Sequence, residues 1–176
     1  MKKKYKFFLK GKKVWVAGHT GMVGSAILKR LKKENCRILT VEQHKLDLTE
    51  QSSTERWIKK NRPQVVFIAA AKVGGILANS NNQADFLYDN LMIQNNIIRL
   101  SSVYNVEKLI FLGSSCIYPK ISKQPINEKQ LMQGPLESTN EGYALAKIAG
   151  LKLAMLYSEK YDLQCICPMF CNLYGN

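Results

Sequence analysis

Two side chains four positions apart, Tyr143 and Lys147 in the stretch YALAK, can move a proton to or from a substrate oxygen. Residues at this spacing lie on one face of a helix. A phenol with a pKa of about 10 is a poor acid-base catalyst at neutral pH, but an ammonium one turn away favours the phenolate and lowers that pKa. We therefore predict a catalytic Tyr143–Lys147 pair, with an ordinary surface pair as the competing interpretation.

A second reactive cluster, GSSCIYPK at 113–120, follows the apolar run KLIFL. In open α/β sheets, ligands bind at the carboxyl ends of the strands, so a polar cluster there indicates either an active site or an ordinary strand exit. Beside Tyr143, Ser114 is placed to hydrogen-bond the substrate oxygen that Tyr143 protonates. The Tyr143–Lys147 pair, this serine-bearing strand end and a glycine-rich first turn are three separate requirements of one site, and their joint presence favours the active-site interpretation.

Glycines in AGHTGMVGSA separate the first apolar run from the first helical pattern, at Gly18, Gly21 and Gly24. Such glycines allow a tight turn, close approach of the backbone to a pyrophosphate, and close packing of the helix on the strand. The helix N-terminus adds free N–H groups and a positive dipole end. The context after a strand and before a helix predicts dinucleotide binding.

The residues that distinguish NAD from NADP are expected about twenty positions later, in LTVEQHKLDL. Glu42 can accept a hydrogen bond from a free 2′-hydroxyl, which favours NAD. His44 or Lys45 can instead pair with a 2′-phosphate, which favours NADP. Asp47 is a candidate for the adenine edge or a plain turn residue. The sequence leaves this choice of cofactor open.

The elements that must position these residues alternate between strand and helix. Near-continuous apolar runs predict strands buried on both faces of a parallel sheet, at 13–18, 36–41, 64–71, 108–114 and 163–169. Helical patterns lie between them, at 21–35, 52–61, 82–105 and 140–161, and Ser52 with Glu55 matches a capping box at the second helix. The order predicts an α/β fold with a doubly wound parallel sheet, the Rossmann fold, and a functional loop at 117–139.

Composition sets the class of protein. Hydrophobic residues make up 46% and charged residues 22% of 176 residues, which is typical of one globular domain. We expect a basic N-terminal extension at 1–12 and a dinucleotide-binding domain at 13–176.

No apolar run is long enough for a membrane span or a signal peptide, so we expect a cytoplasmic protein without a membrane partner. The net charge of +13 comes without an aromatic-basic motif, so we expect no nucleic-acid partner. Five cysteines without a CxxC pair predict reduced thiols and no metal site.

Motifs along nearly the whole chain from Lys13 resemble one family. AGHTGMVGSAI, AAAKVGGI, NIIRL, KLIFLGSSCIYPK, YALAKIAGLKL and NLYG are together similar to the GDP-L-fucose synthase family, in the extended branch of the short-chain dehydrogenase/reductases. The resemblance implies a 3,5-epimerase-4-reductase that converts GDP-4-keto-6-deoxy-D-mannose with NADPH and pairs as a homodimer through helices 82–105 and 140–161. It implies Cys116 as the base beside the ketone, Ser114 as partner of the C4 oxygen, Tyr143 as proton donor and Lys147 as its activator and ribose ligand. The cofactor residues that it implies are Gly18, His19, Thr20, Gly21, Met22, Val23, Gly24, Asp47, Leu112, Gly113, Ser114, Ser115, Lys147, Phe170, Cys171, Asn172 and Leu173.

The chain departs from the family's pattern at several positions. Thr20 stands where the family has an arginine, VEQH replaces basic residues after the second strand, and Phe170 with Cys171 replaces Pro-Thr. NADP is what the resemblance implies, and NAD stays open. We expect the catalytic histidine and the substrate domain after Asn176, because His19 and His44 belong to the cofactor half. The 176 residues alone are then not expected to be a competent epimerase-reductase.

Two other functions remain open. One is another nucleotide-sugar epimerase or dehydratase of the same superfamily, although a UDP-sugar 4-epimerase is expected to lack the cysteine within SSCIYP. The other is a dinucleotide-binding module without catalysis.

Overall fold

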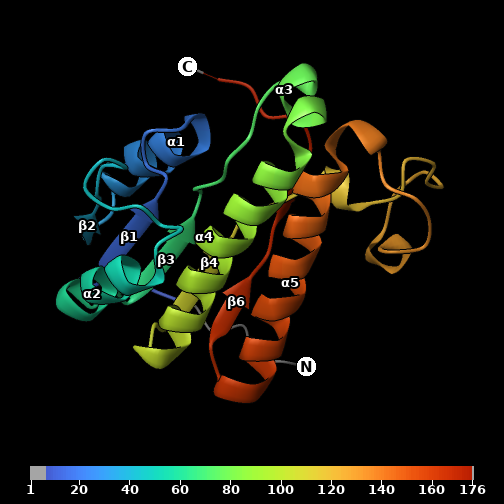
Figure 1. The fold of residues 1–176 in the computed structure, drawn as a ribbon. Coiled ribbons are helices and arrows are strands. Elements are labelled where there is room, and N and C mark those ends of the chain that lie inside the picture. The colour runs from blue at the N-terminus through green and yellow to red at the C-terminus, as the bar shows by residue number, and fades with distance from the viewer. Residues whose placement is uncertain (1–6, 176) are drawn as a thin grey trace, which may run out of the picture.

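The central sheet has five parallel strands in the order β2-β1-β3-β4-β6, as shown in a computed structural model that describes residues 7–175 (Figure 1). The strands are β1 (Lys13–Ala17), β2 (Arg37–Leu39), β3 (Val65–Ile68), β4 (Lys108–Phe111) and β6 (Gln164–Ile166). After β2 the chain crosses back over β1 to start β3, so the strand order reverses between β1 and β3. The predicted doubly wound parallel sheet is confirmed.

Helices cover the two faces of this sheet unequally. They are α1 (Met22–Leu31), α2 (Gln51–Asn61), α3 (Ile76–Asn81), α4 (Gln83–Val103) and α5 (Glu141–Tyr161). The main core lies between the sheet and α2, α4 and α5, and a smaller cluster lies between the sheet and α1. Because right-handed crossovers run in opposite directions from β1, α1 packs on the face opposite the other long helices.

Side chains along β1 point alternately to the two faces of the sheet, and both faces are buried. Trp15 is fully buried in the main core, where its ring lies 4.4 Å from that of Trp57 on α2. Val14 and Val16 are fully buried in the smaller cluster under α1. Successive side chains of a strand point to opposite faces, so a continuous apolar run is required here.

Two predicted strands are each interrupted near their carboxyl ends. Runs 108–114 and 163–169 break into β4 followed by β5 (Gly113–Ser114), and β6 followed by β7 (Met169–Phe170). β5 and β7 form a separate two-stranded parallel sheet. Pro168 has no N–H to continue a ladder, and its carbonyl oxygen accepts from the N–H of Gly113 at 3.0 Å. At these breaks, the segments after β4 and β6 leave the main sheet and run toward the start of α5.

Several predicted bounds differ from the structure. The strands expected at 36–41 and 64–71 are shorter, as is the helix expected at 21–35, and the helix expected at 82–105 is preceded by the separate α3, with Asn82 between them outside helical geometry. The capping box at Ser52 and Glu55 is wrong, because α2 begins at Gln51 with Glu50 as an N-cap that makes no side-chain bond. Ser52 therefore lies inside the first turn, and Glu55 accepts from the hydroxyl of Tyr104 instead.

α4 and α5 pack side by side along their length (Figure 1). The side-chain amide of Gln94 donates to the carbonyl oxygen of Ala146 at 2.6 Å inside this contact. Opposite Gln94, a Cβ on Gly150 would lie 2.5 Å from its amide oxygen, so glycine permits the close approach. The contact fixes the height and rotation of α5, and with them the positions of Tyr143 and Lys147.

The loop predicted at 117–139 is built from short turns rather than long elements. It contains 3-10 turns at Glu128–Gln130 and Ser138–Asn140, and Asn127 with Gln130 forms a capping box at the first of them. Lys120 ties the two ends of the loop together, since its ammonium lies 3.1 Å from the Glu137 carboxylate and its N–H donates to the carbonyl of Pro135. The loop therefore starts and ends beside the β5–β7 pair.

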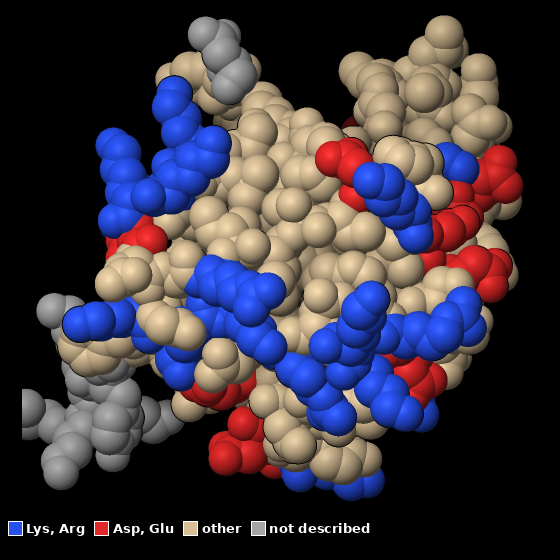
Figure 2. All heavy atoms as spheres, turned by 90° about the vertical axis from the view of Figure 1, so that its left-hand side faces the viewer, with Lys and Arg blue, Asp and Glu red and all other residues tan. Residues whose placement is uncertain are grey.

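Basic side chains gather over the face formed by α1, α2 and β2 (Figure 2). Lys29 and Arg30 lie in the last turn of α1, and Lys59 and Lys60 in the last turn of α2, where cations complement the helix dipole. Of the predicted extension at 1–12, residues 1–6 lie outside the described part of the chain. Phe7 and Leu9 pack against the smaller core cluster. Between residues 7 and 175, none of the helices is both long and apolar enough to cross a bilayer.

Candidate functional site

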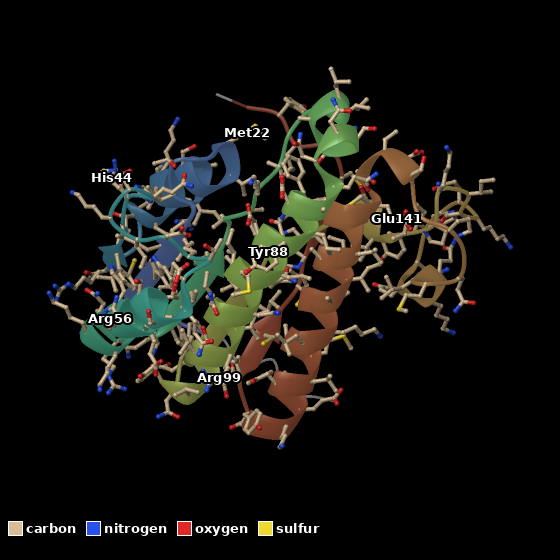
Figure 3. All side chains as sticks on the ribbon, viewed as in Figure 1. Met22, His44, Arg56, Tyr88, Arg99 and Glu141 are labelled. Atoms are coloured by element: carbon tan, nitrogen blue, oxygen red, sulfur yellow. The ribbon has the colours of Figure 1, made fainter. Side chains whose placement is uncertain are left out.

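A hollow of about 550 Å³ lies at the carboxyl edge of the sheet where the strand order reverses. This is the position at which open α/β sheets bind ligands. Figure 3 shows that α1 and α5 begin at this same end of the molecule, where Met22 and Glu141 are labelled. The turn after β1, the segments after β2 and β3, and α4 all contribute to the lining, through residues Gly18, His19, Thr20, Gly21, Val41, Gln43, Asp47, Leu48, Thr49, Ala69, Ala70, Ala71, Lys72, Val73, Asp89 and Ile93.

The three glycines after β1 have different roles. Gly18 has a φ of +82°, and a Cβ there would lie 2.4 Å from the N atom of Ala70. A Cβ on the buried Gly24 would lie 2.0 Å from the carbonyl oxygen of Gly18, so these two glycines serve turn geometry and packing. A Cβ on Gly21 would meet nothing closer than 3.6 Å, and Gly21 lines the hollow. Because Gly21 is the N-cap of α1 and offers no side-chain cap, the first N–H groups of α1 and this free space fit a pyrophosphate.

The segment after β2 is tied back to the glycine turn. His19 Nε2 lies 3.2 Å from Glu42 Oε1, and the His19 side chain is 12% exposed. Gln43 lines the hollow, whereas Glu42 does not. His44 and Lys45 are exposed and do not line it, and Figure 3 shows His44 at the outer edge near α1. The structure therefore brings none of the three predicted 2′-selectivity residues into the lining of the hollow.

Buried asparagines on α4 hold the loops that form the hollow. Asn90, 3% exposed, accepts from the N–H of Lys72 at 2.9 Å and donates to its carbonyl oxygen at 2.8 Å. Asn96 donates to the carbonyl oxygens of Leu48 and Thr49 at 2.9 and 3.0 Å. These side chains satisfy backbone groups that no strand or helix pairs. Sequence reasoning used Asn90 only as part of a helical pattern and did not identify these contacts.

A second hollow, of about 410 Å³, lies between the β5–β7 pair, α3 and the start of α5. It contains three of the four predicted catalytic residues, Ser114, Cys116 and Tyr143, and shares Val73 with the first hollow. The remaining lining residues are Gly74, Asn79, Ser115, Tyr118, Pro119, Lys120, Glu137, Asn140 and Asn172. Of these, the sequence analysis had named Ser115 and Asn172 as site residues, and Tyr118, Pro119 and Lys120 belong to the predicted cluster at 113–120. The run AAAKVGG after β3 was the available signal for Gly74, since small residues at a strand end permit close approach of a ligand.

Lys147 lies beneath this second hollow. Its side chain is 4% exposed, and its ammonium donates to the carbonyl oxygen of Leu112 at 2.9 Å. It also lies 4.8 Å from the ring centroid of Phe111 and 5.6 Å from that of Tyr143. Burial lowers the pKa of Lys147 to about 8, and a negative charge on Cys116 acts in the opposite direction.

The pKa of Tyr143 moves opposite to the prediction. Burial raises it well above its ordinary value, and the proximity of Cys116 raises it further. The ammonium of Lys147 bonds to the Leu112 carbonyl and lies over the ring of Tyr143. Burial dominates, so the expected net lowering of the phenol pKa is wrong for this structure. The phenol consequently keeps its proton at neutral pH, as a proton donor must.

Cys116 and Ser114 are held together by a local turn. Ser114 ends β5, and its Oγ accepts from the N–H of Cys116 at 3.4 Å. Burial raises the pKa of the Cys116 thiol, while the Ser114 hydroxyl and the Lys147 ammonium lower it. The positive charge that a basic cysteine needs is therefore present, but burial has the larger effect.

The other predicted cofactor residues lie in different parts of the site. Gly113 pairs with Met169, and Ser114 with Phe170, so Phe170 lies beside the catalytic strand. Several predicted residues line neither hollow, namely Met22, Val23, Gly24, Leu112, Gly113, Phe170, Cys171 and Leu173. Neither histidine lines the second hollow, and within residues 7–175 no three His, Cys, Asp or Glu side chains gather as a metal site would require.

Comparison with known proteins gives one family. Residues 14–176 match the model of the NAD dependent epimerase/dehydratase family. The chain is 54% identical over 169 residues to a GDP-L-fucose synthase of Sinorhizobium fredii, covering 96% of this chain and 54% of that protein. The chain thus spans about half the length of the curated relatives it matches.

Solved structures agree with the fold. The structure titled DdhaC superposes with a TM-score of 0.94 at 42% identity, covering 96% of this chain and 49% of that one. MlghC, a GDP-mannoheptose C4 reductase of Campylobacter jejuni with NADP bound, gives 0.90 at 38% identity, covering 94% and 52%. The fold, the glycine turn and the family match agree, and the chain belongs to the NAD-dependent epimerase/dehydratase family.

Proposed function

We propose that residues 13–176 form the dinucleotide-binding half of a GDP-sugar epimerase-reductase of the GDP-L-fucose synthase type. The observation that carries the proposal is the adjacency of two hollows that share Val73. One has the space and the helix N-terminus that a pyrophosphate needs, and the other holds Ser114, Cys116 and Tyr143 above Lys147. Similarity to a GDP-L-fucose synthase supports the substrate class.

The first hollow fits NADPH, whose bound form supplies a hydride to C4 of the sugar. The uncapped first turn of α1 and the open position at Gly21 receive the pyrophosphate. A neighbour with NADP bound supports this cofactor. The basic face over α1, α2 and β2 attracts the anionic dinucleotide to this side of the protein (Figure 2).

Residues of the second hollow supply the proton and hydrogen bonds for reduction of the C4 ketone, while the hydride would come from NADPH. Tyr143 donates its proton to the C4 oxygen, and Ser114 hydrogen-bonds the same oxygen. Loss of that proton leaves a phenolate, which the Lys147 ammonium beneath the ring stabilises. The raised pKa of Tyr143 keeps the phenol protonated until this transfer.

Cys116 is the proposed base for epimerisation at C3 and C5. Each proton there is acidic because it lies beside the C4 ketone, and its removal leaves an enolate that Ser114 and Tyr143 stabilise through the C4 oxygen. A proton returned to the opposite face of the carbon completes the inversion. The two histidines of this chain, His19 and His44, both lie at the cofactor side, so neither is assigned that step.

A GDP-sugar C4 reductase without epimerisation is the second candidate, favoured by the similarity to MlghC. The two functions differ in whether protons at C3 and C5 exchange with solvent. The protein from its complete reading frame is therefore assayed with GDP-4-keto-6-deoxy-D-mannose and NADPH in D₂O. The epimerase-reductase predicts GDP-L-fucose with deuterium at C3 and C5, whereas the simple reductase predicts reduction without deuterium at either carbon.

Single variants assign the roles. Tyr143→Phe is expected to lower the rate of reduction by about 10² to 10⁴, the usual loss for one general acid. Cys116→Ser is expected to abolish deuterium uptake at C3 and C5 while leaving NADPH affinity unchanged. NADPH oxidation that is unchanged in Tyr143→Phe would contradict the proposal.

A further inference from the structure

We propose that Gln43, and not Glu42, contacts the adenosine 2′ position of the dinucleotide, and that its neutral amide lets the protein bind NADPH and NADH with similar affinity. The inference depends on the proposed function, because it takes the first hollow as the dinucleotide site. It goes further by assigning the residue that sets cofactor selectivity.

The position of the 2′ group follows from the fold. In Rossmann folds the residue that contacts it stands at the carboxyl end of the strand that follows the glycine turn, here β2. Val41 and Gln43 after β2 both line the hollow, and Glu42 between them does not. The backbone thus presents Gln43 where sequence reasoning expected a carboxylate.

Glu42 is also engaged elsewhere. Its Oε1 lies 3.2 Å from Nε2 of His19, which is nearly buried in the glycine turn, while 47% of the Glu42 side chain is exposed. This contact turns the carboxylate toward the glycine turn and occupies one of its acceptor oxygens. Because Glu42 also lies outside the lining of the hollow, we infer that it is not the 2′-hydroxyl acceptor that would select NADH.

Among the described residues, the lining of the hollow also offers no unpaired lysine or arginine for a 2′-phosphate. Among the described residues that line it, Lys72 is the single lysine or arginine, and its ammonium forms an ion pair with Asp89. Asp47 accepts from the N–H and hydroxyl of Thr49 in a local turn. Lys72 and Asp89 come from the β3 and α4 side, away from the segment after β2. On the β2 side of the lining, Asp47 is the one charged side chain among the described residues, and no cation there selects for the phosphate.

An amide suits both ligands. It carries two N–H donors and one acceptor oxygen, so it can donate to a phosphate oxygen or accept from a hydroxyl. Because it has no net charge, neither bond is a charge-assisted pair of the kind a guanidinium makes with phosphate. The expected result is weak discrimination between the two dinucleotides.

Calorimetric titration of the 176-residue chain with NADPH and with NADH tests the inference, in the parent, Gln43→Arg and the matched neighbour Glu42→Gln. Both residues stand on a partly exposed segment, so both variants are expected to fold. The parent should bind both dinucleotides with dissociation constants within about tenfold of each other. Gln43→Arg should raise the preference for NADPH by about tenfold or more, because a guanidinium binds phosphate through two charged hydrogen bonds.

Glu42→Gln should leave the ratio of the two affinities unchanged. A changed ratio in Glu42→Gln, or an unchanged ratio in Gln43→Arg, overturns this inference and leaves the proposed function intact. A parent preference well beyond tenfold for either dinucleotide also overturns it. A parent that binds neither dinucleotide overturns the proposed function, and this inference with it.

Discussion

The ammonium of Lys147 donates a hydrogen bond to the carbonyl oxygen of Leu112 at 2.9 Å, which joins α5 to the carboxyl end of β4. This bond lies at the point where the chain leaves the main sheet for β5. It places a buried cation under Tyr143 and near Cys116, without a direct bond to either of them. Lys147 therefore both anchors the catalytic strand and sets the charge of the site.

Replacement of Lys147 by methionine is expected to change how stability depends on pH. Burial depresses the folded-state pKa of Lys147 to about 8, below its ordinary value of 10.5. Above pH 8 the folded state therefore binds fewer protons here than the unfolded state, so stability from this residue rises with pH. Between pH 7 and 9 the parent should gain about 1 kcal/mol relative to Lys147→Met.

Urea denaturation of both proteins at pH 7, 8 and 9 measures that difference. Taking the difference between parent and variant cancels the contribution of groups that titrate equally in both proteins. A difference that stays constant or falls as pH rises would show that Lys147 is not a buried cation with a depressed pKa.

Gly24→Ala is expected to destabilise the fold, and Gly21→Ala is not. The added Cβ at Gly24 would lie 2.0 Å from a backbone oxygen that cannot move without breaking the turn, at a cost of about 3 kcal/mol. The Cβ at Gly21 has space and an ordinary backbone angle. Thermal unfolding of the two variants without ligand distinguishes the packing glycine from the ligand-facing one. Equal melting temperatures would contradict this division of roles.

Asn90→Ala is expected to loosen the segment after β3. The change leaves the N–H and carbonyl oxygen of Lys72 unpaired, and each unsatisfied group costs about 1 to 3 kcal/mol. Asn95→Ala, on the exposed side of the same helix, is the matched control and should be near neutral. Hydrogen exchange of the backbone N–H of Lys72 should accelerate in Asn90→Ala alone. The same exchange rate in both variants would remove Asn90 from this role.

Local pattern predicted the order of the strands and helices well. The continuous apolar runs gave the order of strands and helices, and the i, i+4 spacing placed Tyr143 and Lys147 on one face of α5. The glycine turn was predicted because strand, glycines and helix are adjacent in the chain. The capping box predicted from Ser52 and Glu55 is wrong, because α2 begins one residue before Ser52.

Contacts between residues far apart in the chain could not be predicted from the sequence pattern. The bond from Lys147 to Leu112 spans 35 residues. Burial of Tyr143 among such distant parts of the chain raises the pKa that was expected to fall. The engagement of Glu42 by His19 likewise depends on how two strand ends meet, and propensity carries no information about that. Both differences arise from tertiary packing at the carboxyl edge of the sheet.

The central claim, that the glycine turn binds a nicotinamide dinucleotide, is tested most directly by titrating the 176-residue chain with NADPH by calorimetry. Gly21→Val puts a side chain where the pyrophosphate is expected, and Gly75→Val is the matched control, since its Cβ meets nothing within 4 Å and the residue lies outside both hollows. The account predicts that the parent and Gly75→Val bind NADPH equally and that Gly21→Val binds at least about tenfold more weakly, a loss of about 1.4 kcal/mol. Binding of NADPH by Gly21→Val as tight as by the parent would contradict the account.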